Sequence, residues 1–105
     1  MSESKLQKEI LKALKEHPKV GWAYITSAGT VRGMGGGRPF NIGTPGMSDI
    51  LGQIRDGRLF AIEVKIPGKK PTELQIQFIA DVNKFNGVAG WVDSIETAVK
   101  IVEES

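Results

Sequence analysis

Two acidic residues and a lysine stand at a spacing that can build a reactive site. Asp49 lies 14 positions before Glu63, and Glu63 opens the tripeptide Glu63-Val64-Lys65. The residues between them are β-formers on both sides of Asp56-Gly57, which predicts a tight β-hairpin. Such a hairpin brings two carboxylates and an ammonium group to one sheet face. Paired carboxylates can hold a hard divalent cation, and a lysine beside them can position a water, so metal-assisted hydrolysis of a phosphodiester is expected.

The register of this hairpin decides whether the two acids meet, and the sequence leaves two registers open. A two-residue turn on Asp56-Gly57 pairs Asp49 with Val64, which puts Asp49 and Glu63 on opposite faces. A three-residue loop over 55–57, with Gly57 left-handed and a G1 bulge, pairs Asp49 directly with Glu63. We predict the second register, because the alternation of the later strand puts Glu63 and Lys65 together on one face. Opposed carboxylates are then about 4.5–5.5 Å apart at Cβ, close enough to share one ion.

Two polar side chains on predicted helices could join the acid pair. Gln75 falls on the same helical stripe as Phe78 and Val82, where an apolar residue would pack better. The alternative is that Gln75 completes a capping box with Thr72, and one residue can do both. Glu9 lies at the edge of the apolar stripe of the first helix; an ordinary surface acid is the alternative reading there.

Basic residues flank the acid pair in the sequence. Arg32 and Arg38 lie in a glycine-rich stretch, and Lys69 and Lys70 follow the Glu63 tripeptide closely. Positive charge at such places fits the docking of an anion. Four more lysines lie in the first helix, where solvated surface positions are an equally good explanation: Lys5, Lys8, Lys12 and Lys15.

The order of predicted elements is αβββαβα, a mixed α/β fold with a four-stranded sheet flanked by helices. The first predicted helix spans about 5–16 and is opened by a Ser4-x-x-Gln7 capping box. The second spans about 72–86 and is closed by Gly87, and the third begins at Asp93 or Ser94 and includes the last residues. The predicted strands span about 20–26, 48–54, 58–66 and 88–92. Residues 29–46 hold seven of the 13 glycines and are predicted to form one long loop, mobile without substrate. Trp22 and Trp91 are expected to be core aromatics in strands.

Length and composition place the chain among ordinary soluble proteins. The chain has 105 residues, and we expect residues 1–105 to form a single domain. Its composition, 40% hydrophobic and 25% charged residues, is typical of a globular protein. No apolar run is long enough for a membrane span, and the N-terminus lacks a signal core, so a cytoplasmic protein is expected. With no cysteine and only His17 as histidine, zinc sites and histidine-based triads are excluded. A net charge of +2 favours nucleic acid only weakly.

The order of these motifs resembles a known family. Glu9, Gly46-x-Ser48-Asp49, Glu63-Val64-Lys65 and Thr72-x-x-Gln75 are similar to the four motifs of the PD-(D/E)XK nuclease superfamily, and most of all to its VRR-NUC branch in the small stand-alone form carried by phages. The resemblance covers roughly residues 5–102, and αβββαβα matches the restriction-endonuclease-like core of that superfamily. Ser48 stands where the superfamily's name has proline, a position that varies.

The resemblance implies a ligand set and roles. It implies that Glu9, Asp49, Glu63 and the Val64 carbonyl bind Mg²⁺ or Mn²⁺. Lys65 would then orient the attacking water or stabilise charge at the phosphate, and Gln75 would support the water shell of the metal. A phage-encoded member would act in the host cell cytoplasm.

The leading hypothesis is therefore a Mg²⁺-dependent endonuclease acting on structured or branched DNA, such as a Holliday junction. Arg32, Arg38, Lys69 and Lys70 would contact phosphates, so binding should be salt-sensitive. One core carries one site, so cutting both strands of a junction calls for a homodimer. The alternatives are a catalytically silent nucleic-acid-binding module that keeps the fold and a small interaction domain with no nucleic-acid role.

Overall fold

A computed structural model describes residues 1–26, 30–32, 39–41 and 45–105, and its elements follow the predicted order. The helices are α1 (Glu3–Glu16), α2 (Glu73–Lys84) and α3 (Ile95–Glu103), and the strands are β1 (Val20–Ile25), β2 (Thr30–Arg32), β3 (Pro39–Asn41), β4 (Ile50–Ile54), β5 (Leu59–Val64) and β6 (Val88–Val92). Leaving out the small pair β2–β3, the order is αβββαβα, so the predicted fold class is confirmed.

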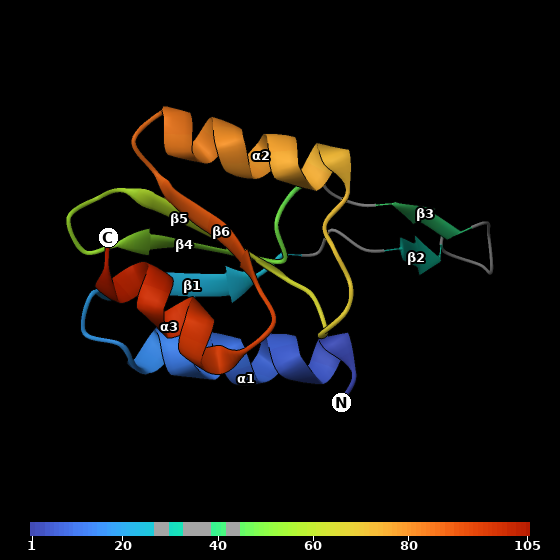
Figure 1. Ribbon diagram of the computed structural model, residues 1–105, viewed down its shortest axis with the longest axis horizontal. Helices are drawn as coiled ribbons and strands as arrows, with labels where there is room; N and C mark the ends of the chain where they lie inside the picture. The colour runs from blue at the N-terminus through green and yellow to red at the C-terminus, as the bar shows by residue number, and fades with distance from the viewer. Residues whose placement is uncertain (27–29, 33–38, 42–44) are drawn as a thin grey trace.

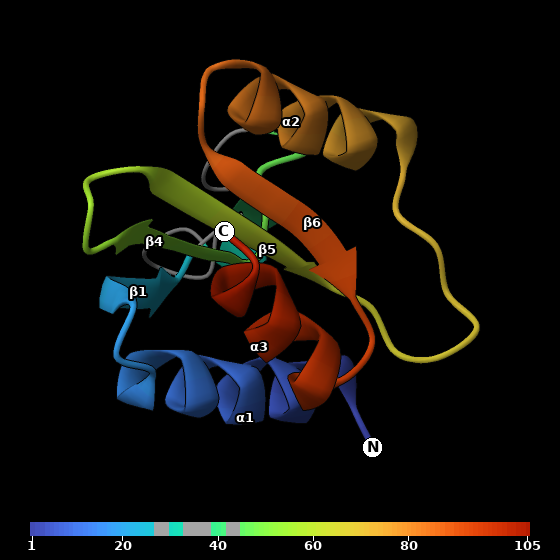
Figure 2. The same cartoon turned by 60° about the vertical axis from the view of Figure 1, so that its left-hand side comes forward.

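A four-stranded mixed sheet forms the middle layer of the molecule. Its strand order is β1-β4-β5-β6, antiparallel except for the parallel pair β5–β6. Helices α1 and α3 cover one face and α2 lies over the other (Figures 1 and 2). The core lies on the α1 and α3 side, where the alternate residues Phe60, Ile62 and Val64 of β5 are fully buried against Ile10 and Val102. This alternation sends Glu63 to the α2 side.

The β4–β5 hairpin takes the three-residue loop that the sequence analysis favoured. Ile50 pairs with Ile62 and Gln53 with Leu59, so one further step places Asp49 opposite Glu63. The Ile54 N–H donates to the Arg58 carbonyl at 2.8 Å, which closes a loop of three residues. Gly57, the last of them, has φ +103°, a conformation that favours glycine. The register that opposes the two acids is therefore confirmed.

Two helix termini differ from the sequence-based prediction. Ser2, not Ser4, is the N-cap of α1, and its Oγ accepts from the Lys5 N–H at 3.1 Å. The helix begins two residues early because a serine at position 2 also puts the acid Glu3 in the positive first turn. At the end of α2, the left-handed residue is Asn86 (φ 70°) rather than Gly87. The N–H of Gly87 instead donates to the Val82 carbonyl.

Part of the predicted glycine-rich loop is ordered as strand. β2 and β3 pair antiparallel, Thr30 with Asn41 and Arg32 with Pro39, so the prediction of loop over the whole of 29–46 was wrong for these residues. The strands are too short to show a period-2 pattern among the glycines. The predicted mobility of this stretch, and Arg38, lie outside the described residues.

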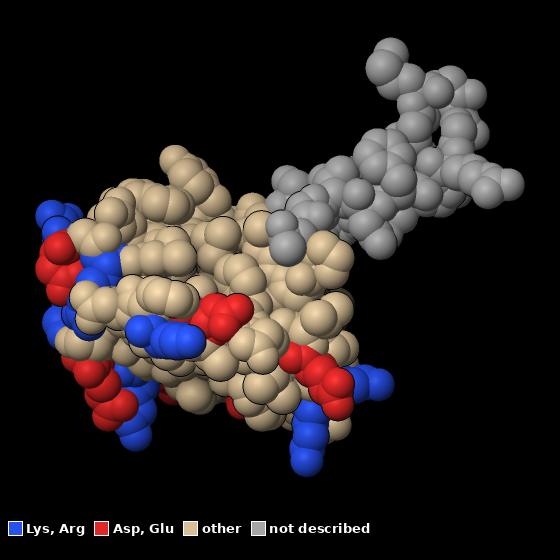
Figure 3. Space-filling model, turned by 90° about the horizontal axis from the view of Figure 1, so that it is seen from above, with Lys and Arg blue, Asp and Glu red and all other residues tan. Residues whose placement is uncertain are grey.

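The two tryptophans are not core residues. Trp22 is 41% and Trp91 42% exposed, so the prediction that both are buried was wrong. For Trp22 the reason is the coverage of the sheet: α2 packs mainly over β5 and β6, which leaves the β1–β4 half of that face uncovered by a helix (Figure 2). Trp91 lies on β6, where α2 packs without any fully buried residue, so this part of the face is only partly covered. Seen from the α2 side, much of the described surface carries no charged side chain (Figure 3).

The outer edge of β6 is blocked by a side chain of α2. The Asn83 amide nitrogen donates to the Ala89 carbonyl at 3.0 Å, and the Ala89 N–H donates to the Asn83 Oδ1 at 2.9 Å. One amide thus satisfies both backbone groups that a neighbouring strand would use. This contact opposes strand addition at the middle of β6.

Candidate metal centre

One row of side chains crosses the sheet at the end where β5 finishes. Asp49 lies opposite Glu63, and Glu63 pairs with Trp91 of β6 in the parallel register. Paired residues of neighbouring strands present their side chains on the same face, so all three lie on the α2 side. The row joins two acids to one half-exposed indole.

Asp49 is fixed by the backbone of β5. Its Oδ2 accepts a hydrogen bond from the Val64 N–H at 2.9 Å, while its own carbonyl accepts from the Thr26 N–H at 2.8 Å. In an extended strand the N–H and C=O of one residue point to the same edge, so the Val64 carbonyl also faces the β4 side where Asp49 lies. The direction of this carbonyl is compatible with the metal-ligand role that the resemblance implies for Val64, and that role stays a prediction.

Glu63 is a buried acid without a full set of partners. It is 1% exposed, and its Oε1 has no hydrogen-bond partner among the residues that the structure describes. The pKa of Glu63 is raised to about 8: burial is the largest cause, the hydrogen bond and the charge of Asp49 also raise it, and the charge of Lys65 lowers it. A buried carboxylate oxygen without a donor is a costly group, which a cation or a proton would satisfy.

Lys65 supplies the positive charge at this site. Its Nζ lies 3.7 Å from Glu63 Oε2, and the side chain is mostly buried. This distance is an ion pair rather than a tight hydrogen bond, so the ammonium group keeps donors for other partners. Asp49, Glu63 and Lys65 are therefore brought together on one face, as their spacing predicted.

The segment leading to Asp49 is held by close packing on α2. Gly46 has φ +85°, and a Cβ built there would lie 2.6 Å from the Leu74 carbonyl oxygen. Only glycine fits this conformation and this approach. Ser48 is fully buried, its carbonyl accepts from Thr26 Oγ1 at 3.0 Å, and its Oγ has no partner among the described residues.

No acid of helix α1 joins Asp49 and Glu63 in a group that could hold a metal ion among the described residues, and the predicted role of Glu9 stays a prediction. The α1 acid whose charge contributes to the raised pKa of Glu63 is Glu3.

Gln75 has the capping role that the sequence left open. Its Oε1 accepts from the Thr72 N–H at 2.8 Å, and its N–H donates to Thr72 Oγ1 at 3.2 Å, which completes a capping box. Its side-chain amide nitrogen makes no hydrogen bond with any residue in the described ranges. Support of a metal's water shell by this group stays a prediction.

The predicted phosphate contacts are described only in part. Lys69 and Lys70 are exposed on a turn that the Lys69 N–H closes onto the Ile66 carbonyl at 3.1 Å, with Gly68 at φ +92°. This turn follows Lys65 directly, at the same end of the sheet as the acid pair (Figure 1). The backbone of Arg32 belongs to β2, and its side chain, like the whole of Arg38, lies outside the described part.

Comparisons with protein families and with curated proteins give no information on this site. No protein-family model matches the sequence, and no curated protein matches it. Among the described helices, none is long and apolar enough to cross a membrane.

Proposed function

We propose that this chain is a divalent-metal-dependent endonuclease that hydrolyses phosphodiester bonds in structured or branched DNA. The observation that carries the proposal is the buried Glu63, whose Oε1 has no partner among the described residues, opposite Asp49 and 3.7 Å from the ammonium group of Lys65. Oxygen ligands of this kind suit Mg²⁺ or Mn²⁺, which keep several waters and need few protein ligands. The donor set fits such an ion.

Asp49, Glu63 and the Val64 carbonyl would hold the ion, and Glu9 stays a predicted further ligand. When bound, the ion would neutralise charge on the scissile phosphate and make a coordinated water more acidic. Lys65 donates to the attacking water or to a phosphate oxygen, because its ammonium group is charged and anchored beside Glu63. The Val64 N–H keeps Asp49 oriented through the bond to its Oδ2.

The proposed substrate and assembly follow from the resemblance to stand-alone VRR-NUC proteins and from the single acid pair. A Holliday-type junction needs two cuts, so two copies of the chain would act together as a homodimer. Arg32, Arg38, Lys69 and Lys70 would bind phosphates on either side of the cut. The proposed place of action is the cytoplasm, that of the host cell if the protein is phage-encoded.

Cleavage of a labelled four-way junction in Mg²⁺ tests the proposal. Wild type should cut, and Asp49→Ala and Lys65→Ala should each lose at least about 100-fold in rate, the size expected for removing a group that acts on the reacting centre. Glu96→Gln, an exposed acid on α3, is the matched control and should keep full activity. Equal cleavage by wild type, Asp49→Ala and Lys65→Ala would remove the assignment.

One observation favours a second candidate, a catalytically silent nucleic-acid-binding module. Within the described residues, two carboxylates rather than three converge at the site, which gives a weaker metal centre. This candidate predicts junction binding without cleavage at any concentration of Mg²⁺ or Mn²⁺. A titration of both ions in the cleavage assay separates the two candidates.

A further inference from the structure

An aromatic pair lies on the open half of the sheet face that carries the acid pair. Trp22 pairs with Gln53 and Tyr24 with Leu51 in the β1–β4 register, which puts both rings on the α2 side with Asp49 and Glu63. Tyr24 is 63% exposed and Trp22 41%, although both stand in a regular strand. Helix α2 packs mainly over β5 and β6 and not over this half of the sheet (Figure 2), which agrees with the exposure of the two rings.

The two rings are held in place rather than left free. Their centroids lie 5.4 Å apart with a tilt of 34°. The Trp22 indole N–H donates to Gln53 Oε1 at 2.9 Å, and the Gln53 amide nitrogen donates to the Gly57 carbonyl at 2.8 Å. This chain of hydrogen bonds ties an exposed indole to the hairpin loop that sets the register of the acid pair. An ordered, exposed aromatic surface is a preorganised contact surface.

The charges around the pair suit a nucleic-acid strand. Strands β1 and β4 contain no charged residue, so no carboxylate on either of them repels a phosphate. Lys15 places its Nζ 5.9 Å from the centroid of the Tyr24 ring. Aromatic rings with a neighbouring cation are what proteins use to bind unpaired bases and their backbone.

The aromatic pair lies close to the acid pair on the same face of the sheet. Tyr24 is one strand across and two residues along from Asp49, which is about 8 Å at the usual strand spacing and rise. That is on the order of one or two nucleotides of an extended strand. Bases inside a duplex present no free face to a ring, so only unpaired bases can use this surface.

We infer that Trp22 and Tyr24 form a stacking surface for unpaired nucleobases next to the acid pair. The inference rests on the proposed function and refines its substrate: DNA with a single-stranded segment beside the bond that is cut, such as a flap or an open branch point. Trp22 and Tyr24 are binding residues here, and neither takes part in the chemical step.

Binding of fluorescein-labelled oligothymidylate, measured by anisotropy in EDTA, tests the inference without cleavage. Trp22→Ala and Tyr24→Ala should each weaken binding at least about fivefold, the low end for loss of one stacked base. Tyr24→Phe keeps the ring and should bind as wild type does. Phe85→Ala removes a 79% exposed aromatic at the end of α2 and should also bind as wild type does. Binding to a blunt duplex should be unchanged in all variants.

A second readout reports contact directly and does not depend on the stability of an alanine variant. In Trp91→Phe protein, Trp22 is the remaining tryptophan, and its fluorescence should fall when oligothymidylate stacks on it. The inference is overturned if wild type does not bind oligothymidylate, if Trp22→Ala and Tyr24→Ala bind it as tightly as wild type, or if duplex binding weakens equally. It is also overturned if wild type is a dimer that Trp22→Ala dissociates with oligonucleotide binding unchanged, because the rings then form an interface between copies.

The outcome is separate from that of the cleavage assay. Junction cleavage with normal binding by the two alanine variants would remove the stacking surface and keep the nuclease. Stacking without cleavage under any divalent ion would remove the nuclease and keep a module that binds single strands.

Discussion

Glu63 is the residue at which burial and charge conflict most strongly. Its carboxyl group lies inside the protein, opposite the Asp49 carboxyl, and within the described ranges Lys65 is the cation paired with it. The pKa of Glu63 is raised to about 8, chiefly by burial, so near neutral pH the metal-free protein holds a proton on this acid pair. The proton and a divalent cation would compete for the same oxygens.

The raised pKa of Glu63 predicts how stability depends on pH. In the unfolded chain the carboxyl ionises near 4.5 and in the folded chain near 8, so between these values the folded state binds the extra proton. The free energy of unfolding should therefore fall as pH rises from about 4.5 to 8, by on the order of a few kcal/mol. Urea unfolding in EDTA at pH 5 and pH 8 measures it.

The substitution Glu63→Gln removes the ionisable carboxyl group, so it should remove most of the pH dependence of the unfolding free energy. Glu96→Gln replaces an exposed acid and should keep that dependence. Mg²⁺ should stabilise wild type more at pH 8 than at pH 5, because fewer protons compete. A stability that rises with pH across this window in wild type would contradict the raised pKa.

At the scale of the elements, the hairpin and the segment before it place the acids. Two of their features could be predicted from sequence because local residues indicate them: Asp56-Gly57 marks the turn, and alternation in β5 gives the face of Glu63 and Lys65. The turn residues alone allow two registers, and the alternation favoured the one that the structure has. The N-cap of α1 could not be predicted, because Ser2 and Ser4 are both possible caps in the sequence. The exposure of Trp22 was missed because a period-2 pattern gives the face of a residue, not whether a helix covers it.

Gly46 and Gly68 allow a matched test of how the segment before Asp49 is held. Both have a positive φ, but a Cβ at Gly46 would meet the Leu74 backbone at 2.6 Å, whereas a Cβ at Gly68 has no atom within 4 Å. Gly68→Ala should cost about 1 kcal/mol for conformation alone. Gly46→Ala should cost roughly 2–4 kcal/mol, because the backbone must also move away from α2.

Urea unfolding gives the two energies, and junction cleavage under conditions where both variants are folded gives the effect on the site. Gly46→Ala should cut at least about tenfold more slowly than Gly68→Ala, because displacing the segment moves Asp49 away from its partner atoms. Equal stability and equal rates in the two variants would show that the contact with Leu74 does not position Asp49.

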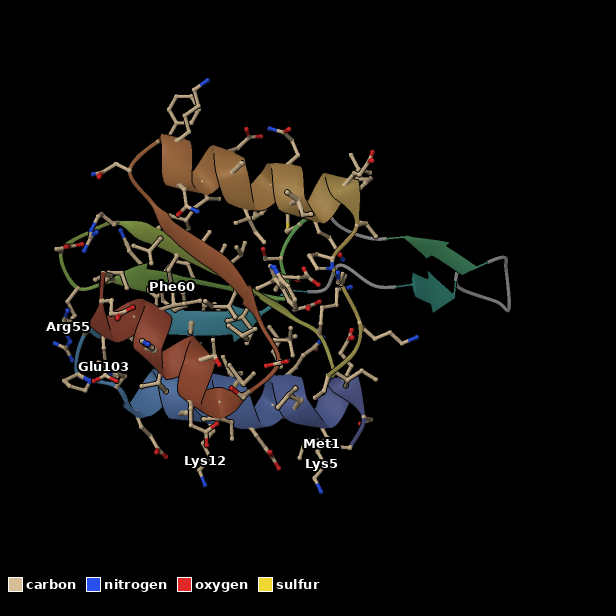
Figure 4. The ribbon with its side chains drawn as sticks, viewed as in Figure 1. Met1, Lys5, Lys12, Arg55, Phe60 and Glu103 are labelled. Carbon is tan, nitrogen blue, oxygen red and sulfur yellow. The ribbon has the colours of Figure 1, made fainter. Side chains whose placement is uncertain are left out.

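At the scale of the whole molecule, the fold distributes basic residues between the two ends of the sheet. The acid pair and the exposed turn with Lys69 and Lys70 share one end, where Met1 and Lys5 also lie, while Arg55 lies at the hairpin loop of the other end (Figure 4). Arg58, beside that loop, is paired with Asp56 at 2.9 Å. A net charge of +2 does not reveal this arrangement; the fold does, because it gathers residues far apart in sequence.

This arrangement predicts which cations bind DNA. Replacing both Lys69 and Lys70 by alanine should weaken junction and duplex binding alike, by about tenfold near 100 mM salt, because phosphate contacts carry no sequence or branch information. The slope of the logarithm of the DNA association constant against the logarithm of salt concentration should become shallower by about 2, one for each lost contact. Arg55→Ala removes a cation from the other end and should change neither the affinity nor the slope. Anisotropy titrations from 50 to 200 mM salt decide between these outcomes, and an equal effect of Arg55→Ala would mean that DNA does not dock at the acid end of the sheet.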